Sequence, residues 1–253
     1  MSDRIDTFEV GETVRVIATT RSGDIMVVGG KPGTVRVVVD GGGAGNYEID
    51  QIGDVISIEP RRKGRFVGSS ADVVLTVPTG ASLELSCTSG DINVQAPVTE
   101  LRANVASGDV RVDSVASGCR VNSASGDIRL KWAGDAEINT ASGTVRLGRI
   151  DRSLRVNAAN GNVFVDEIGD SAICKAASSS VRVGSFEGSE FRLKTMSGDL
   201  HLGIPPHRTI ELDFSSLSGR LRNKLPKGDG SPSEKTVTIA VTAVSGDLTL
   251  KGA

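Results

Sequence analysis

Hydrophobic and polar residues alternate along this chain in blocks of about 18 residues, and a Ser-Gly-Asp phrase marks most of the blocks. Clear copies are Ser89-Gly90-Asp91, Ser107-Gly108-Asp109, Ser125-Gly126-Asp127 and Ser197-Gly198-Asp199. Less exact copies of the phrase lie at residues 142–144, 160–162 and 178–180. A fixed period of this size is typical of an architecture built by stacking one repeated unit.

Each block predicts two short strands with one buried face, because its apolar residues recur at every second position. The strand after the repeat glycine carries inward pairs such as Ile92 and Val94, Val110 and Val112, Ile128 and Leu130, Val145 and Leu147, Val163 and Val165, Val181 and Val183, and Leu200 and Leu202. The strand before the glycine carries Leu83 and Leu85, Leu101 and Ala103, Cys119 and Val121, Ala136 and Ile138, Leu154 and Val156, Ala172 and Cys174, and Phe191 and Leu193. A third apolar column comprises Val115, Ile150, Ile168 and Phe186.

These columns predict an all-β fold, a three-sided parallel β-helix (β-solenoid) with about 18 residues per coil and irregular β caps at both ends. Right-handed winding is expected from the general preference of parallel β connections. We expect one continuous domain, with an N-terminal β region and cap over 1–82, regular coils over 83–204, and C-terminal coils and a cap over 205–253. The polar stretch 223–236 predicts a mobile loop.

The composition suits a narrow interior, since aromatic residues make up only 3% of the 253 residues and the 31 glycines suit many tight turns. The net charge of −2 argues against a general attraction to nucleic acid. The first residues, Met1–Asp6, lack the apolar core of a signal peptide, and no apolar run is long enough for a membrane-spanning helix. The sequence therefore predicts a cytoplasmic location.

Several phrases make the chain resemble the DUF4097 family of bacterial β-strand-repeat proteins, which are described as adhesin-like. They are Thr7-Phe8-Glu9-Val10, Arg21-Ser22-Gly23-Asp24-Ile25, Val77-Pro78-Thr79-Gly80-Ala81, and the Ser-Gly-Asp series. The resemblance covers nearly the whole chain, and it implies a β-solenoid without established catalysis.

The aspartates of the repeat phrase, among them Asp91, Asp109 and Asp127, could hold either a turn or a calcium ion. Calcium-binding repeats carry two glycine-rich phrases per turn, whereas this chain has one Gly-Asp pair per coil. We therefore expect the aspartates to stabilise the turn, and we expect no metal site and no cofactor. The three cysteines occupy inward columns, where they serve as small apolar residues, and no intramolecular disulfide is expected.

The outward positions between the apolar residues carry polar and basic side chains. An arginine column after the glycine is a candidate surface for an anionic ligand and consists of Arg111, Arg129, Arg146 and Arg182. A second column comprises Arg102, Arg120, Arg155 and Arg192, and the densest basic run is Arg61–Arg65. An outward ladder of stacked amides is expected at Asn104, Asn122, Asn139 and Asn157. His201 lies on the outward face as well, and no catalytic motif accompanies it.

Two functions fit this pattern. The first is a non-enzymatic β-solenoid scaffold or adhesin-like module that binds a protein partner, or a second copy of itself, through a solenoid face or end. The alternative is a carbohydrate-binding or carbohydrate-active β-helix, with an anionic polysaccharide as its partner. A carbohydrate-active enzyme would need clustered carboxylates beside aromatic platforms, and the chain is poor in aromatic residues. No catalytic residue is predicted, and neither a nucleic acid nor a membrane span is expected.

Overall fold

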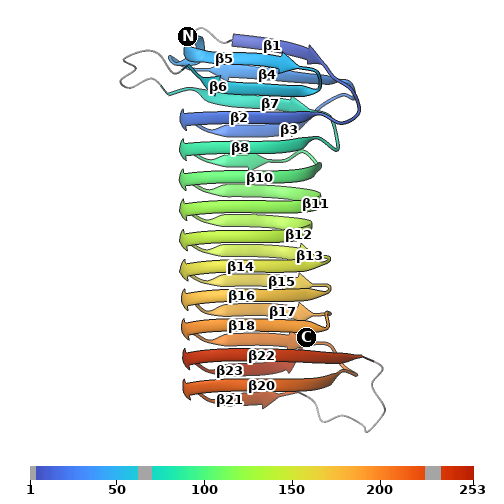
Figure 1. Cartoon of the computed structure of the whole chain (residues 1–253), viewed down its shortest axis with the longest axis vertical. Helices are drawn as coiled ribbons and strands as arrows, with labels where there is room; N and C mark the ends of the chain where they lie inside the picture. Colours follow the sequence, from blue (N-terminus) through green and yellow to red (C-terminus); the bar gives the residue numbers. More distant parts are fainter. Residues whose placement is uncertain (1–3, 62–69, 226–234) are drawn as a thin grey trace. The chain divides into compact units, whose positions relative to one another are not determined.

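The computed structural model describes residues 4–61, 70–225 and 235–253, and the chain divides into two compact units, 1–130 and 131–253. Both units are built from β-strands, with one short 3₁₀ turn at Ala44–Asn46 and no α-helix among the described residues. The predicted all-β solenoid is therefore confirmed (Figure 1). Strand β12 (Ile128–Ser142) contributes residues to both units.

The first unit contains two stacks of parallel strands. One stack runs β6–β2–β8–β10–β11 and the other runs β7–β3–β9–β11. The parallel strands are β2 (Arg15–Ser22), β3 (Ile25–Gly29), β6 (Val55–Pro60), β7 (Asp72–Val77), β8 (Ser82–Ser89), β9 (Ile92–Val94), β10 (Val98–Ser107) and β11 (Val110–Ser125). β11 belongs to both stacks, because its first residues pair with β9 and its later ones with β10.

The N-terminal region begins with an irregular cap and then joins the regular coils. Antiparallel strands β1 (Arg4–Glu9), β4 (Thr34–Asp40) and β5 (Tyr47–Ile52) pair with β4, β7 and β6 respectively. By contrast, β2 and β3 form a coil in register with β8 and β9, so that Ser22 pairs with Ser89 and Ile25 with Ile92. The copy of the repeat phrase at Ser22 is thus structurally equivalent to the later copies, although about 67 residues separate it from the next one.

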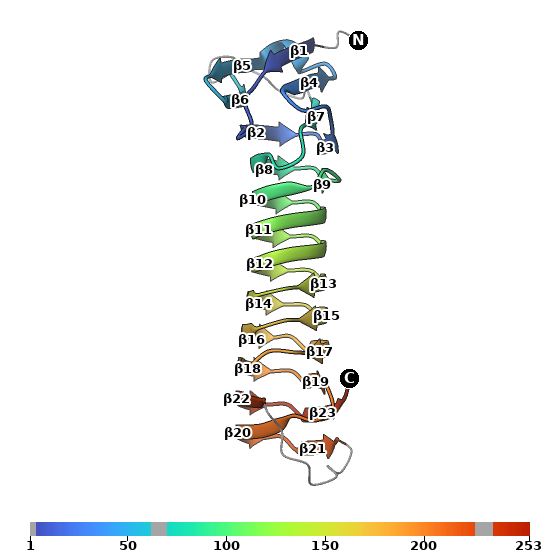
Figure 2. The same cartoon turned by 90° about the vertical axis from the view of Figure 1, so that its right-hand side faces the viewer.

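The second unit repeats this construction with two strands per coil (Figure 2). One stack runs β12–β14–β16–β18–β22–β20 and the other runs β13–β15–β17–β19–β23–β21. The strands are β13 (Val145–Ile150), β14 (Ser153–Asn160), β15 (Val163–Ile168), β16 (Ser171–Ser178), β17 (Val181–Phe186), β18 (Glu190–Ser197), β19 (Leu200–Ile204), β20 (Thr209–Ser218), β21 (Leu221–Lys224), β22 (Thr236–Ser245) and β23 (Leu248–Gly252).

The last two coils of this unit are stacked out of sequence order. The coil β22–β23, which comes last in the chain, lies between β18–β19 and β20–β21. Most of the predicted loop 223–236 lies outside the described residues, as does 62–65 of the basic run, and β21 ends at Lys224 while β22 begins at Thr236.

The inward columns form the core of each unit. Ile92, Val110 and Ile128 are fully buried after the repeat glycine, and so are Val115, Ile150, Ile168 and Phe186 of the third column. Ile150, Ile168 and Phe186 end β13, β15 and β17, so the third column extends the second strand of each coil rather than forming a strand of its own. The three-sided cross-section and the right-handed winding stay predictions.

The three cysteines are buried and free, as their inward columns predict. Burial raises the pKa of both Cys119 and Cys174 to about 12. Since the thiolate is the reactive species, a buried thiol with so high a pKa should react only after unfolding.

We expect iodoacetamide at pH 8 to leave Cys119 and Cys174 unmodified in the folded protein for hours. The denatured chain should be modified at three cysteines within minutes. Mass spectrometry of intact and digested protein measures both. Rapid modification of Cys174 in the folded chain, or fewer than three thiols in the non-reduced, denatured chain, would contradict the inward placement.

Candidate ligand-binding surface

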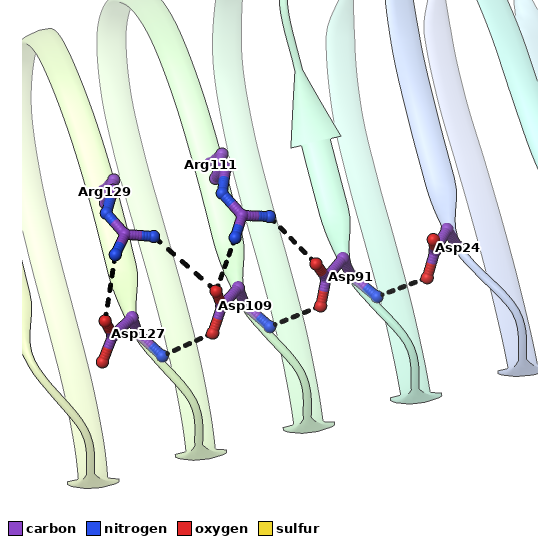
Figure 3. A network of polar contacts seen from close by, with 6 residues as sticks. All are labelled: Asp24, Asp91, Asp109, Arg111, Asp127 and Arg129. Carbon is purple, nitrogen blue, oxygen red and sulfur yellow. Dashed lines mark hydrogen bonds and ion pairs between the residues drawn. The ribbon is translucent and has the colours of Figure 1, made fainter.

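The repeat aspartates form a ladder that ties each coil of the first unit to the next (Figure 3). The carboxylate of each aspartate accepts a hydrogen bond from the backbone N–H of the equivalent aspartate one coil further along the stack, at 2.8–2.9 Å for the pairs Asp24–Asp91, Asp91–Asp109 and Asp109–Asp127. Asp72 continues the ladder by accepting the N–H of Asp24. The predicted structural role of the aspartates is thus confirmed, but their hydrogen bonds join adjacent coils and do not close the turn in which each aspartate lies.

The arginines of the first unit are engaged by this ladder. Arg111 bonds Asp91 at 2.9 Å and Asp109 at 2.6 Å, while Arg129 bonds Asp127 at 3.1 Å and lies 3.6 Å from Asp109. Each guanidinium therefore has carboxylates both in its own coil and in the neighbouring coil. Ion pairs this exposed contribute little stability individually, but they satisfy the charge and the donors of Arg111 and Arg129.

The ladder also changes the titration of its members. The backbone N–H of Asp109, and then the guanidinium of Arg111, lower the pKa of Asp91. A lowered pKa in the folded state means that ionised Asp91 stabilises the protein above the ordinary carboxyl range, and that this contribution is lost as the pH falls through the lowered pKa.

We expect the variant Asp91→Asn to melt below the wild-type protein at pH 7, with the difference shrinking as the pH falls below the ordinary carboxyl value of about 4. Thermal melts followed by circular dichroism across this range measure the effect. A difference that grows with acidification would show that Asp91 is not stabilised in its ionised form.

Removal of a central carboxylate should weaken the ladder. Asp109→Ala leaves the N–H of Asp127 without its acceptor and Arg111 and Arg129 without a shared partner, so we expect a loss of about 1–2 kcal/mol in the free energy of unfolding. Asp109→Asn keeps an acceptor oxygen and should lose about half as much.

Chemical denaturation of the two Asp109 variants measures this loss. Asp50→Ala is the matched control, since Asp50 is an exposed strand residue outside the ladder and should cost less than about 0.5 kcal/mol. Equal losses for Asp109→Ala and Asp50→Ala would contradict the structural role.

In the second unit the ladder positions of three coils carry neutral residues, and the arginines beside them pack differently. Thr144, Asn162 and Ser180 replace the aspartates. Arg146 and Arg182 instead stack on the ring of Phe164, with guanidinium carbons 5.6 Å and 5.9 Å from its centroid. Such cation–π contacts hold a guanidinium in place without neutralising its charge. Arg111 and Arg129 of the predicted anion surface therefore contact carboxylates, and Arg146 and Arg182 both contact the ring of Phe164.

The remaining outward columns keep the predicted register within each unit. The amide of Asn122 donates to Asn104 at 2.8 Å, and that of Asn157 donates to Asn139 at 2.7 Å, which confirms one step of the amide ladder in each unit. Arg102 and Arg120 lie side by side on adjacent strands. His201 pairs in register with Arg182. Among the described residues, no group of three or more His, Cys, Asp or Glu is placed to hold a metal ion.

Part of the polar network was not predicted from the sequence. Arg149 bridges Asp151 at 2.6 Å and Glu167 at 2.8 Å, and the indole of Trp132 donates to Asp151 at 3.0 Å. Arg152 bonds Asp135 across one coil at 2.6 Å, and Ser153 bonds the same carboxylate. The coil spacing of 17–18 residues is the signal that could have paired them, since it brings Asp135 and Arg152 to adjacent coils.

Stacked parallel coils, turn glycines and an aspartate ladder together define a β-solenoid repeat protein. The sequence profile of the Toastrack DUF4097 family matches residues 12–167, and the chain belongs to this family. The resemblance noted from the sequence is thereby confirmed. A search of curated protein sequences found no match.

Solved structures of proteins from Bacteroides and Parabacteroides share the fold at low sequence identity. A candidate adhesin from Bacteroides fragilis NCTC 9343 is 13% identical, with a TM-score of 0.51 over 100% of this chain and 97% of the other. A candidate lipid-binding protein from Parabacteroides distasonis ATCC 8503 is 15% identical, with a TM-score of 0.54 over 97% and 96%. A candidate adhesin from Parabacteroides merdae ATCC 43184 is 11% identical, with a TM-score of 0.50 over 98% and 95%.

Within the part of the chain that the structure describes, none of the helical segments has the length and apolarity needed to span a membrane.

Proposed function

We propose that this chain is a non-enzymatic, adhesin-like interaction module that binds its partner through the outward face of its stacked strands. The observation that carries the proposal is the register of the outward residues. In the second unit, Arg146, Phe164, Arg182 and His201 occupy equivalent positions on β13, β15, β17 and β19. A face with one side chain per coil at a fixed spacing suits an extended partner that makes repeated contacts.

Self-association through the coil β20–β21, which ends the stack of the second unit, belongs to the same proposal. Along β20, the side chains of Ile210, Leu212 and Phe214 are only half-buried, and Leu217 and Leu221 are 88% and 44% exposed. Among the described strands, β20 pairs with β22 alone, so its other edge has backbone groups that another strand could pair with. Light scattering that shows a monomer at high concentration would contradict this part of the proposal.

The adhesin-like role is supported by the family and by the neighbours described as candidate adhesins, which share the fold. The right-handed, three-sided coil predicted from the sequence stays part of the proposal, while the predicted cytoplasmic location is a separate prediction that binding to cell surfaces would contradict. Subcellular fractionation of the source cells tests the location.

A sedimentation assay with intact bacterial cells and their isolated surface polymers tests the function. Fluorescently labelled full chain should bind saturably, unlabelled folded chain should compete, and heat-denatured chain should not. Size-exclusion chromatography of the same polymers should show no shortening. Shortened polymers would favour the carbohydrate-active alternative, and a lack of saturable binding to any surface would contradict the proposal.

A further inference from the structure

One stretch of the outward face in the second unit differs in charge from its counterpart in the first. An aspartate lies two residues before each of Arg111 and Arg129 in the same coil. Each arginine forms an ion pair with that aspartate. Arg182 has Ser180 at that position, and the preceding coil has Asn162. Among the described residues, Arg182 has no hydrogen bond or ion pair, and its exposed guanidinium keeps its donors for a ligand.

The ring of Phe164 fixes where this charge lies. Phe164 stands between Arg146 and Arg182 in the register of β13, β15 and β17, and both guanidinium carbons lie 5.6–5.9 Å from its centroid. Two strand spacings separate the arginines, about 10 Å along the stack. Because the ring restricts both long side chains, less conformational entropy is lost when an anion binds.

The residues beside this column restrict which ligand shapes can bind there. Glycine occupies positions 148, 184 and 203, two residues after Arg146, Arg182 and His201, so these three strand positions carry no side chain of their own. Two carboxylates bound the site: Asp166, two residues after Phe164, and Asp199, two residues before His201. A broad anionic surface such as a membrane would be repelled by both, whereas a narrow linear polymer can follow the column between them.

From this arrangement we infer a binding site for the carboxylate groups of a linear acidic polysaccharide, formed by Arg182, Phe164 and Arg146 with His201 at its edge. Arg182 binds one carboxylate through its planar pair of N–H donors, which matches the geometry of that group. Arg146 packs against the same ring, two strand spacings from Arg182. This inference rests on the proposed function, and it names the class of ligand and the part of the face that binds it.

Oligogalacturonate of about ten residues, titrated into the full chain at low salt, tests the site, since a polymer makes several weak contacts at once. We expect saturable binding that weakens strongly between about 20 and 200 mM NaCl, because the contacts are exposed charges. Neutral dextran and monomeric galacturonate should bind at least about tenfold more weakly. Absence of oligogalacturonate binding would overturn the inference.

Single substitutions locate the site. Arg182→Gln should lower the affinity by about tenfold, the effect of one lost charge-assisted pair. Arg182→Lys should fall between wild type and Arg182→Gln, since it keeps the charge but loses the planar pair of donors. Phe164→Ala should lower the affinity by about threefold by freeing both arginines. Melting temperatures of all variants verify that the coils remain folded.

Arg111→Gln is the matched control. It removes an arginine from the equivalent column position, but Arg111 is already ion-paired with Asp91 and Asp109. It should change the affinity by less than about twofold. An equal loss for Arg111→Gln and Arg182→Gln would show general charge attraction and overturn the site.

Vesicles of phosphatidylglycerol separate the polymer from a lipid surface. Binding to vesicles that depends on Arg182, without binding to oligogalacturonate, would overturn the polysaccharide assignment. The cell-binding assay tests the proposed function independently of this site. If Arg182→Gln still binds cells saturably, the adhesin-like role is kept and this site is rejected.

Discussion

Replacement of Gly108 by alanine should destabilise the chain by about 3–4 kcal/mol and lower its melting temperature by about 10 °C. Gly108 has a φ of +142°, a backbone conformation that side chains with a Cβ rarely adopt, and this strain alone costs about 1–2 kcal/mol. A Cβ would also lie 2.0 Å from the carbonyl oxygen of Gly90, which belongs to the backbone of the preceding coil. The neighbouring coil cannot move away without breaking its own ladder, so both costs add.

Two glycines of the same unit separate these causes. Gly53 has a φ of +60°, and a Cβ added there would meet no atom within 4 Å, so Gly53→Ala should show the strain alone, about 1 kcal/mol. Gly118 lies in open space without a positive φ, and Gly118→Ala should be nearly neutral. Thermal and urea unfolding followed by circular dichroism measure all three. A Gly108→Ala protein as stable as Gly118→Ala would refute the close stacking of the turns.

Most of the fold could be predicted from the sequence because the repeat carries redundant information. Each coil repeats the same alternation, so one mistaken position is corrected by the others, and the buried columns at Ile92, Val110 and Ile128 follow directly. The stacking order at the two ends could not be predicted. The residues of Ser22–Asp24 and of Thr236–Ser245 do not indicate which coil each segment pairs with, because the repeat phrases are alike and can pair with any copy in the stack.

The candidate site was predictable only in outline. The arginine column is visible in the sequence, since Arg111 and Arg182 stand at the same position of their repeats. Their different surroundings depend on the residue one coil away, and that neighbour is known only when the register is known. The change from Asp109 to Ser180 at the ladder position is a weak signal by itself. The contact of Arg182 with Phe164 shows that the arginine at this position has an aromatic neighbour, and that contact forms only when the coils are stacked.

The interior of the second unit contains an aromatic pair, in a chain with few aromatic residues. Phe186 ends β17 and Phe191 lies at the start of β18, so the pair closes the corner between two strands. Both side chains are fully buried, and their rings meet edge to face with centroids 5.4 Å apart and planes at 80°. Edge-to-face contact adds to the free energy gained from burial. The smaller aliphatic residues of the neighbouring coils cannot fill the same volume.

Phe186→Ala should therefore lower the free energy of unfolding by about 3–5 kcal/mol, since it removes a buried ring, leaves a cavity and takes away the partner of Phe191. Phe186→Leu should cost less, because leucine fills part of the space. Leu217→Ala is the control from the same unit, since Leu217 is 88% exposed, and it should be nearly neutral. Urea denaturation followed by circular dichroism gives the three values. If Phe186→Ala were as stable as Leu217→Ala, the third inward column would be misplaced and the coil register of the second unit would be wrong.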